Sequence, residues 1–241
     1  MAEFKAVFFD AAGTLFETRE PVGYSYARIA REFGVHAEPE QVTVAFRRTS
    51  HEAPGLAFGP GRGAEELRRL ERRWWYDLVE ATFASFEKFN DFEGYFDSLF
   101  AFFADPANWL ADPEAVPTLE ALRRHGLTLG VVSNFDHRLY RILDGLGLRR
   151  CFDSVTISSE AGFAKPAPEL FEMALKHHGI RADQALHVGD SEHLDVAGAT
   201  GAGIAAVLID RKSPEHRVRV GNSVRISSLA GVIDELAALS G

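Results

Sequence analysis

Five short apolar runs, separated by stretches of helical periodicity, constrain the fold of this chain more than any other feature. The runs cover residues 4–9, 127–132, 155–157, 185–188 and 204–209, and the helical stretches cover 114–125, 138–146, 169–178 and 193–200. A run that is apolar throughout is typical of a strand buried on both faces. Regular alternation of such strands with helices predicts an α/β fold with a parallel sheet and helices on both of its faces.

Residues 18–111 interrupt this alternation. They contain no apolar run that we interpret as a strand, and helical periodicity instead covers 24–33, 41–48, 64–83 and 92–103. In the third of these segments an apolar stripe has the 3.6-residue spacing of a packed helix, and it comprises Leu67, Leu70, Trp74, Leu78 and Ala81. We therefore predict an α/β core domain formed by residues 1–17 and 112–241, with residues 18–111 inserted as an all-helical domain.

Composition excludes several classes of function. Among 241 residues, 26 Lys and Arg face 35 Asp and Glu, so the net charge of −9 makes nucleic acid and anionic membranes poor partners. No run of 18 apolar residues occurs, and the first residues lack the basic and apolar regions of a signal peptide. The single cysteine, Cys151, cannot form an internal disulfide and is expected to be buried. We expect a cytoplasmic protein that is a monomer or a homodimer.

Polar residues stand where the predicted strands end. Asp10 follows the first run, Ser133 and Asn134 follow the second, and Asp190 follows the fourth. Lys165 lies in a loop between them, and Asp195 comes shortly after Asp190. Because a doubly wound sheet places its ligand at the carboxyl ends of its strands, these side chains are candidates for one site.

In this order, the segments resemble the four motifs of the haloacid dehalogenase superfamily. The matching segments are FFDAAGTLF at 8–16, VVSNF at 131–135, AKPAPELF at 164–171 and HVGDSEHLDVAGATGAG at 187–203. Three further segments are PVGYSYARIAREFGV at 21–35, RRWWYDLVEATF at 72–83 and the stretch at 133–166. They resemble a narrower group, the haloacid dehalogenase-like hydrolase domain-containing protein 3 type, so that the resemblance covers nearly the whole chain. The resemblance implies a Rossmann-like core with a helical cap inserted between the first and second motifs.

The resemblance also implies a role for each motif residue in the hydrolysis of a small phosphate ester. Asp10 is the expected nucleophile, and Lys165 the positive charge beside the transferred group. A magnesium ion is expected on Asp10, Asp190 and the backbone carbonyl of Ala12, with Asp195 orienting ligands or pairing with Lys165. The remaining expected contacts are donation to phosphoryl oxygens by the Ser133 hydroxyl and the amide of Asn134, and donation to Asp10 by Thr14.

Two positions, Asp190 and Ala12, bear on which activity the chain has. Metal-free 2-haloacid dehalogenases share the DA-x-GT start but have no carboxylate where Asp190 stands, so Asp190 favours a metal site and a phosphate substrate. Phosphatases of the superfamily usually carry a second Asp two residues after the nucleophile, where this chain has Ala12. Loss of that general acid and base predicts slow turnover. The sequence therefore leaves open a phosphatase, a dehalogenase, and a non-catalytic protein that binds a phosphate or a partner.

Overall fold

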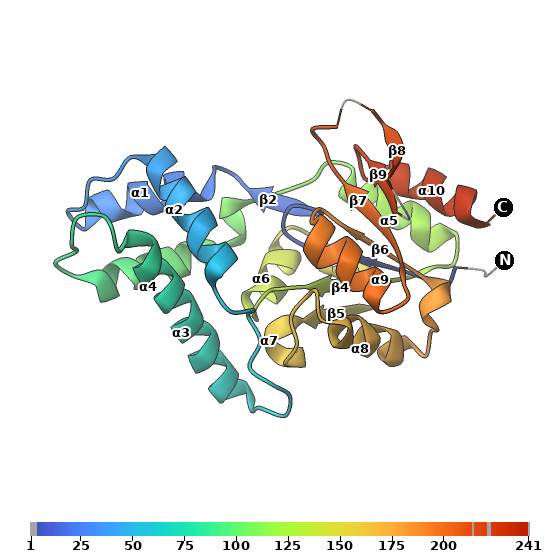
Figure 1. Ribbon diagram of the computed structural model, residues 1–241, viewed down its shortest axis with the longest axis horizontal. Helices are drawn as coiled ribbons and strands as arrows, with labels where there is room; N and C mark the ends of the chain where they lie inside the picture. The colour runs from blue at the N-terminus through green and yellow to red at the C-terminus, as the bar shows by residue number, and fades with distance from the viewer. Residues whose placement is uncertain (1–3, 214, 221–222, 241) are drawn as a thin grey trace.

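The computed structural model, which describes residues 4–213, 215–220 and 223–240, contains a seven-stranded sheet in the order β5-β4-β1-β6-β7-β9-β8 (Figure 1). All neighbouring pairs are parallel except β8 and β9. The strands are β1 (Ala6–Phe9), β4 (Thr128–Ser133), β5 (Ser154–Ile157), β6 (Ala185–Gly189), β7 (Ala205–Ile209), β8 (Arg217–Val220) and β9 (Ser223–Ile226). This confirms the predicted α/β, Rossmann-like fold.

Helices cover both faces of the sheet, as the apolar strands require. Successive side chains of β1 point to opposite faces, so Phe9 packs into one buried cluster and Phe8 into the other. The helices that follow residue 111 are α5 (Ala115–Arg124), α6 (Arg138–Gly145), α7 (Ser158–Ala161), α8 (Pro168–His178), α9 (Gly198–Gly201) and α10 (Gly231–Ser240). Short turns of other helix types are η1 (Pro106–Asn108), η2 (Arg149–Cys151), η3 (Ala182–Gln184) and η4 (Glu192–Ala197), of which η4 is a π-helix. Cys151 is buried, as expected.

Four helices lie together beside the sheet and account for most of residues 18–111 (Figure 1). They are α1 (Val22–Glu32), α2 (Pro39–Glu52), α3 (Ala64–Phe83) and α4 (Phe92–Ala104). Their shared core is rich in aromatic side chains, with Tyr95 and Phe96 almost fully buried in it. The division into a core of residues 1–17 and 112–241 and an inserted domain of residues 18–111 stays a prediction. Of the predicted core, residues 1–3, 214, 221–222 and 241 lie outside the described residues.

The structure adds strands that the sequence pattern did not predict. β2 (Phe16–Thr18) and β3 (Trp109–Ala111) form a two-stranded antiparallel ribbon at the two ends of the helical insertion. β8 and β9 form a hairpin at one edge of the main sheet. The expected helix over 193–200 is divided between η4 and α9.

One face of α3 differs from the predicted stripe. Leu67 and Leu78 are buried, as expected, but Ala81 is exposed and Glu71 is buried. The reason is that Glu71 accepts hydrogen bonds from the backbone N–H of His137, at 3.3 Å, and pairs with the His137 ring. A polar residue with such partners can be buried at a small net cost, and hydropathy alone does not reveal it.

A buried ion pair follows β4 and joins the sheet to the helical insertion. The carboxylate of Asp136 accepts bonds from Arg138 Nε at 2.9 Å and Nη2 at 2.5 Å, and neither side chain is more than 6% exposed. Trp75 of α3 donates its ring N–H to the same carboxylate at 2.6 Å. Burial alone would raise the pKa of Asp136, but the adjacent Arg138 guanidinium outweighs burial and lowers it.

We expect Asp136→Asn to lower the free energy of unfolding by roughly 3–5 kcal/mol at pH 7, because it leaves Arg138 buried without a counterion. Since the folded-state pKa is depressed, this stabilisation is complete above the unfolded-state value of about 3.9 and disappears as the pH falls through the lower folded-state value. Urea unfolding of both proteins between pH 3 and pH 7 should therefore show the difference narrowing in acid.

Asp183→Asn is the matched control, because Asp183 also pairs with an arginine two residues away but both side chains are more than half exposed. It should leave the free energy of unfolding close to that of the unchanged protein. If Asp136→Asn lowered the free energy of unfolding no more than Asp183→Asn does, the stabilising role of the buried Asp136–Arg138 pair would be contradicted.

Candidate active site

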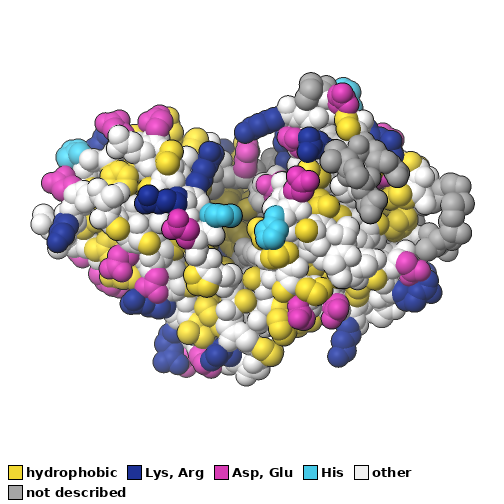
Figure 2. Space-filling view, viewed as in Figure 1, with side chains coloured by type: hydrophobic (Ala, Val, Ile, Leu, Met, Phe, Trp, Pro, Cys, Tyr) yellow, Lys and Arg dark blue, Asp and Glu magenta, His cyan; other side chains and the backbone are white. Residues whose placement is uncertain are grey.

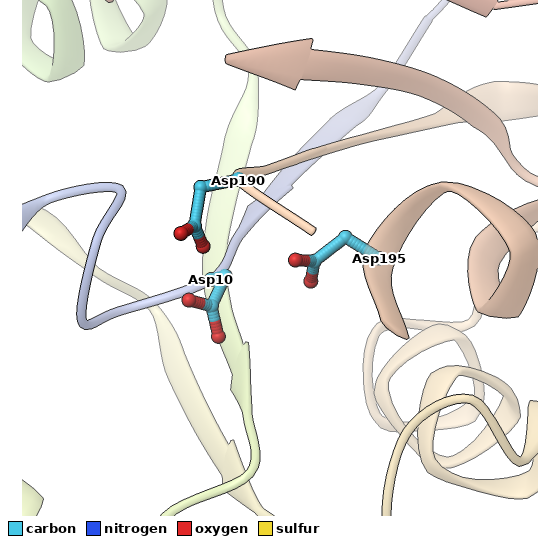
Figure 3. Close-up of side chains that lie close together, drawn as sticks. All are labelled: Asp10, Asp190 and Asp195. Carbon is cyan, nitrogen blue, oxygen red and sulfur yellow. The ribbon is translucent and has the colours of Figure 1, made fainter. Parts of the chain in front are cut away.

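Three carboxylates meet at the carboxyl edge of the sheet (Figure 3). Asp10 directly follows β1, Asp190 follows β6, and Asp195 lies on η4. Each offers a carboxylate oxygen within 4.8 Å of the others. They come together because β1 and β6 are parallel neighbours in the sheet, which puts the residues after both strands at the same edge.

Lys165 places its ammonium group between two of these carboxylates. Its Nζ donates to Asp10 Oδ1 at 2.5 Å and to Asp195 Oδ1 at 2.6 Å, and the lysine is 5% exposed. The same oxygen of Asp195 contacts His187 Nε2 at 2.8 Å, while its second oxygen accepts the Ser191 backbone N–H at 3.0 Å. The expected pairing of Asp195 with Lys165 is therefore present, and its carboxylate is already occupied by protein donors.

The residues after β4 contact this cluster in two different ways. Ser133 donates its hydroxyl to Asp10 Oδ1 at 2.9 Å. The Asn134 side chain instead holds the lysine loop, since its Nδ2 donates to the Lys165 carbonyl at 3.0 Å and its Oδ1 accepts the Lys165 N–H at 2.7 Å. The side-chain amide of Asn134 is thus committed to positioning Lys165.

The expected hydrogen bond from Thr14 to Asp10 is absent. Thr14 is fully buried, and its hydroxyl has no partner among the described residues. The chain turns tightly after Asp10, with the Leu15 N–H donating to the Ala11 carbonyl at 2.8 Å. This turn directs Thr14 into the interior, whereas Ala12 lines the cavity in front of Asp10.

The electrostatics of the cluster reflect an excess of negative charge. Burial raises the pKa of Asp10, although Lys165 opposes the shift. Burial would also raise the pKa of Asp195, but Lys165 and His187 outweigh it and lower that pKa. Asp190 faces the cavity, where partial withdrawal from bulk water and the charges of Asp10 and Asp195 raise its pKa to about 6. Of the three carboxylates, Asp190 is the exposed one, and Asp10 and Asp195 are buried.

This donor set suits a hard divalent cation. Carboxylate oxygens are the ligands that Mg²⁺ prefers, and Mg²⁺ is usually held by one or two of them together with water. Asp10 and Asp190 have oxygens to offer, and a cation between them would relieve their repulsion. Asp10 and Asp190 lie close enough to share a cation, and the full predicted set of Asp10, Asp190 and the Ala12 carbonyl stays a prediction.

Two glycines allow the carboxylates to approach the backbone. A Cβ on Gly13 would lie 2.5 Å from Asp190 Oδ2, and the backbone there has φ of +90°. A Cβ on Gly189 would lie 2.1 Å from Asp195 Cγ. Asp190 and Asp195 can occupy these places only because neither glycine has a side chain.

Sequence reasoning missed Arg211, which follows β7. Its guanidinium donates to the carbonyls of Gly13 at 2.7 Å and Thr14 at 2.6 Å, and it also pairs with Asp112 at the end of the insertion. The arginine therefore holds the turn that carries Asp10. No local pattern marks it, because its partners lie 99 to 198 positions away along the chain.

Comparison with known proteins places the chain in a family. The profile of the haloacid dehalogenase-like hydrolases matches residues 4–203. The chain belongs to the haloacid dehalogenase-like hydrolases. A relative in this hydrolase family is the haloacid dehalogenase-like hydrolase domain-containing protein 3 of Mus musculus, which is 37% identical over 218 residues, covering 88% of this chain and 84% of the mouse protein.

Solved structures of haloacid dehalogenase-like hydrolases share the fold. A HAD phosphatase from Thermococcus onnurineus has a TM-score of 0.65 and 25% identity, covering 97% of this chain and 98% of that one. A 2-haloacid dehalogenase from Pseudomonas syringae has a TM-score of 0.66 and 25% identity, covering 99% and 100%. Similarity thus extends to a phosphatase and to a dehalogenase alike. In the described part of this hydrolase, no helix is long and apolar enough to span a bilayer.

We expect millimolar MgCl₂ to raise the melting temperature of the unchanged protein, since an ion that binds only the folded state stabilises it. Gly13→Ala should abolish most of this rise by pushing Asp190 away. Thermal unfolding with and without MgCl₂ measures both effects.

Gly34→Ala separates this effect from backbone strain. Gly34 has a similar φ of +81°, but nothing lies within 4 Å of its Cβ position. Both variants should lose roughly 1–2 kcal/mol of stability through the backbone, and only Gly34→Ala should keep the magnesium response. Equal responses in the two variants would argue against a cation beside Asp190.

Proposed function

We propose that this chain is a magnesium-dependent phosphohydrolase that cleaves a small phosphate ester through an aspartyl-phosphate on Asp10. The observation that carries the proposal is the cluster of three carboxylates with oxygens within 4.8 Å of one another, two of which pair with Lys165. A site meant for displacing halide from carbon has no need of a second carboxylate that faces the first. Asp190 adds like charge beside Asp10, and a cation that is part of the working site would balance it.

Asp10 is oriented for attack by its own hydrogen bonds. Ser133 and Lys165 both donate to Oδ1, so Oδ2 is the oxygen we assign as nucleophile. Attack of Oδ2 on phosphorus forms the aspartyl-phosphate and expels the leaving oxygen, which takes a proton from water to become the alcohol. Water then attacks phosphorus, which releases inorganic phosphate and regenerates the carboxylate. The Lys165 ammonium, fixed by Asp195, balances charge on the phosphoryl oxygens. When bound, Mg²⁺ supplies further positive charge against the same oxygens.

Ala12 leaves the proton transfers without a side-chain donor at the expected place. A general acid and base is worth roughly 100- to 10,000-fold in rate. We therefore propose slow turnover that is best with esters whose leaving group needs little protonation. In the non-catalytic alternative, the same absence would leave a protein that binds a phosphate or a partner and hydrolyses no ester.

A metal-independent 2-haloacid dehalogenase is the second candidate. Its support is the structural similarity to the Pseudomonas syringae enzyme together with Ala12. Chloride release from 2-chloropropionate without added metal would favour the dehalogenase. Hydrolysis of p-nitrophenyl phosphate that requires magnesium and stops with a chelator would favour the phosphatase.

Asp10→Asn should abolish turnover of p-nitrophenyl phosphate, because an amide cannot act as the nucleophile and supplies no charge to a cation. The fold should persist, since the carboxylate is already destabilised by burial and by its acidic neighbours. Steady-state kinetics together with melting curves test both statements. Residual activity within tenfold of the unchanged protein would rule out the covalent route.

Ala12→Asp should increase turnover of alkyl phosphates by up to roughly 100-fold, because only proton transfer is missing from the arrangement. The gain should be smaller for aryl phosphates, whose leaving groups need less help. Ala12→Asn is the matched control, because the amide has nearly the same size as the carboxyl group but cannot act as a general acid or base. A folded Ala12→Asp protein that responds to magnesium but hydrolyses no ester faster would contradict a site poised for phosphoryl transfer.

A further inference from the structure

The cavity in front of Asp10 extends well beyond the carboxylates. Its volume is about 490 Å³, and one end is formed by Lys165 and the three carboxylates of Asp10, Asp190 and Asp195. Figure 2 shows the hollow between the two halves of the molecule, with hydrophobic side chains in its depth. The far end is lined mainly by aromatic rings, which are Tyr26, Phe46, Trp75, Phe96, Phe100 and Phe103.

Neighbouring rings already hold this aromatic wall in place. Tyr26 contacts Phe46 edge-on with 5.3 Å between the ring centres, and it contacts Phe103 at 5.8 Å. Both are favourable geometries for aromatic pairs. A wall that is packed before ligand binding does not have to be ordered by the ligand, so apolar area buried against it contributes directly to affinity.

Few charged side chains line the cavity away from the Lys165 cluster, and none of them is available to bind a second anionic group. Among the described lining residues these charges are Glu17 and Arg138. Glu17 would repel an anionic group. Arg138 is already paired with Asp136, and its guanidinium lies over the Phe100 ring at 4.0 Å and the Trp75 ring at 4.9 Å. Its charge is thus balanced and covered by protein.

We propose that the cavity selects phosphate monoesters whose leaving group is uncharged, apolar and ring-bearing. The proposal rests on the proposed function, because it takes the Asp10 end as the phosphoryl site. A leaving group with a carboxylate, or one with many hydroxyls, would lose its hydration against aromatic rings that cannot replace it. A ring would fit against rings and leave only the phosphate in the charged end.

The test compares 2-phenylethyl phosphate with ethyl phosphate in the presence of magnesium. Both leaving groups are unactivated primary alcohols of similar acidity, so the comparison isolates burial of the ring. We expect kcat/KM to be at least tenfold higher for the phenylethyl ester, and lower for phosphoglycolate, which carries a carboxylate, than for ethyl phosphate. Equal values for the first two esters, with clear magnesium-dependent turnover, would overturn this inference and leave the proposed function standing.

Binding of phosphonates, which cannot be hydrolysed, distinguishes failure of the proposed function from failure of the inferred selectivity. If no ester is hydrolysed, the proposed function fails, and calorimetry with 2-phenylethylphosphonate and ethylphosphonate in magnesium still tests the cavity. At least tenfold tighter binding of the ring-bearing phosphonate supports the selectivity. Equal affinity overturns it.

Phe46→Ala and Phe86→Ala assign the selectivity to the cavity wall. Both phenylalanines are half-buried members of the same aromatic cluster, but only Phe46 lines the cavity. Phe46→Ala should reduce the preference for the ring-bearing ester at least threefold, and Phe86→Ala should preserve it. An equal reduction in both would mean that the preference does not come from this wall. Should Phe46→Ala fail to fold, Phe46→Leu takes its place, and the ester comparison on the unchanged protein stands independently.

Discussion

The buried ammonium group of Lys165 is the charge on which the edge of the sheet depends. It lies between Asp10 and Asp195, and without it two carboxylates would be buried against each other with Asp190 close by. Asn134 fixes the backbone of the lysine, and Asp195 is in turn fixed by His187 and Ser191. One positive charge therefore faces three carboxylates, which leaves the cluster negative. A cation between Asp10 and Asp190 would balance that remaining charge, and this is the role that we propose for magnesium.

The aromatic insertion completes the site from the other side. The charged end of the cavity is built on the sheet, whereas most of the apolar end is built on α1 to α4. Arg138 stands at the boundary, with its charge held by Asp136 and its flat faces against rings of the insertion. An arginine used in this way contributes packing area as much as charge. The two ends of the cavity therefore differ in chemistry, because one is charged and the other apolar.

Much of this could be predicted from the sequence, for identifiable reasons. Strands such as β1 are apolar throughout because both faces are covered, and Asp10 and Asp190 are conspicuous because each ends such a run. The ribbon of β2 and β3 could not be predicted, because strands of three residues are too short to show alternation. Glu71 and Arg211 were missed for another reason: their partners are remote in sequence, so only the folded chain shows why a charged residue stands there. For Thr14 the motif match predicted a hydrogen bond to Asp10, but it did not reveal that the side chain points into the interior.

The ribbon of β2 and β3 has a consequence for how proteins of this kind can diversify. The chain leaves the sheet and returns to it through two strands that are hydrogen-bonded to each other, so the inserted segment begins and ends at one place. A segment with adjacent ends can be lengthened, shortened or exchanged without changing the register of the main sheet. The Asp136–Arg138 pair belongs entirely to the segment after β4, and of its hydrogen bonds a replacement would have to supply only the one from Trp75. The charged groups around Lys165 and most of the aromatic lining of the cavity are thus encoded in separate stretches of sequence and can change independently over generations.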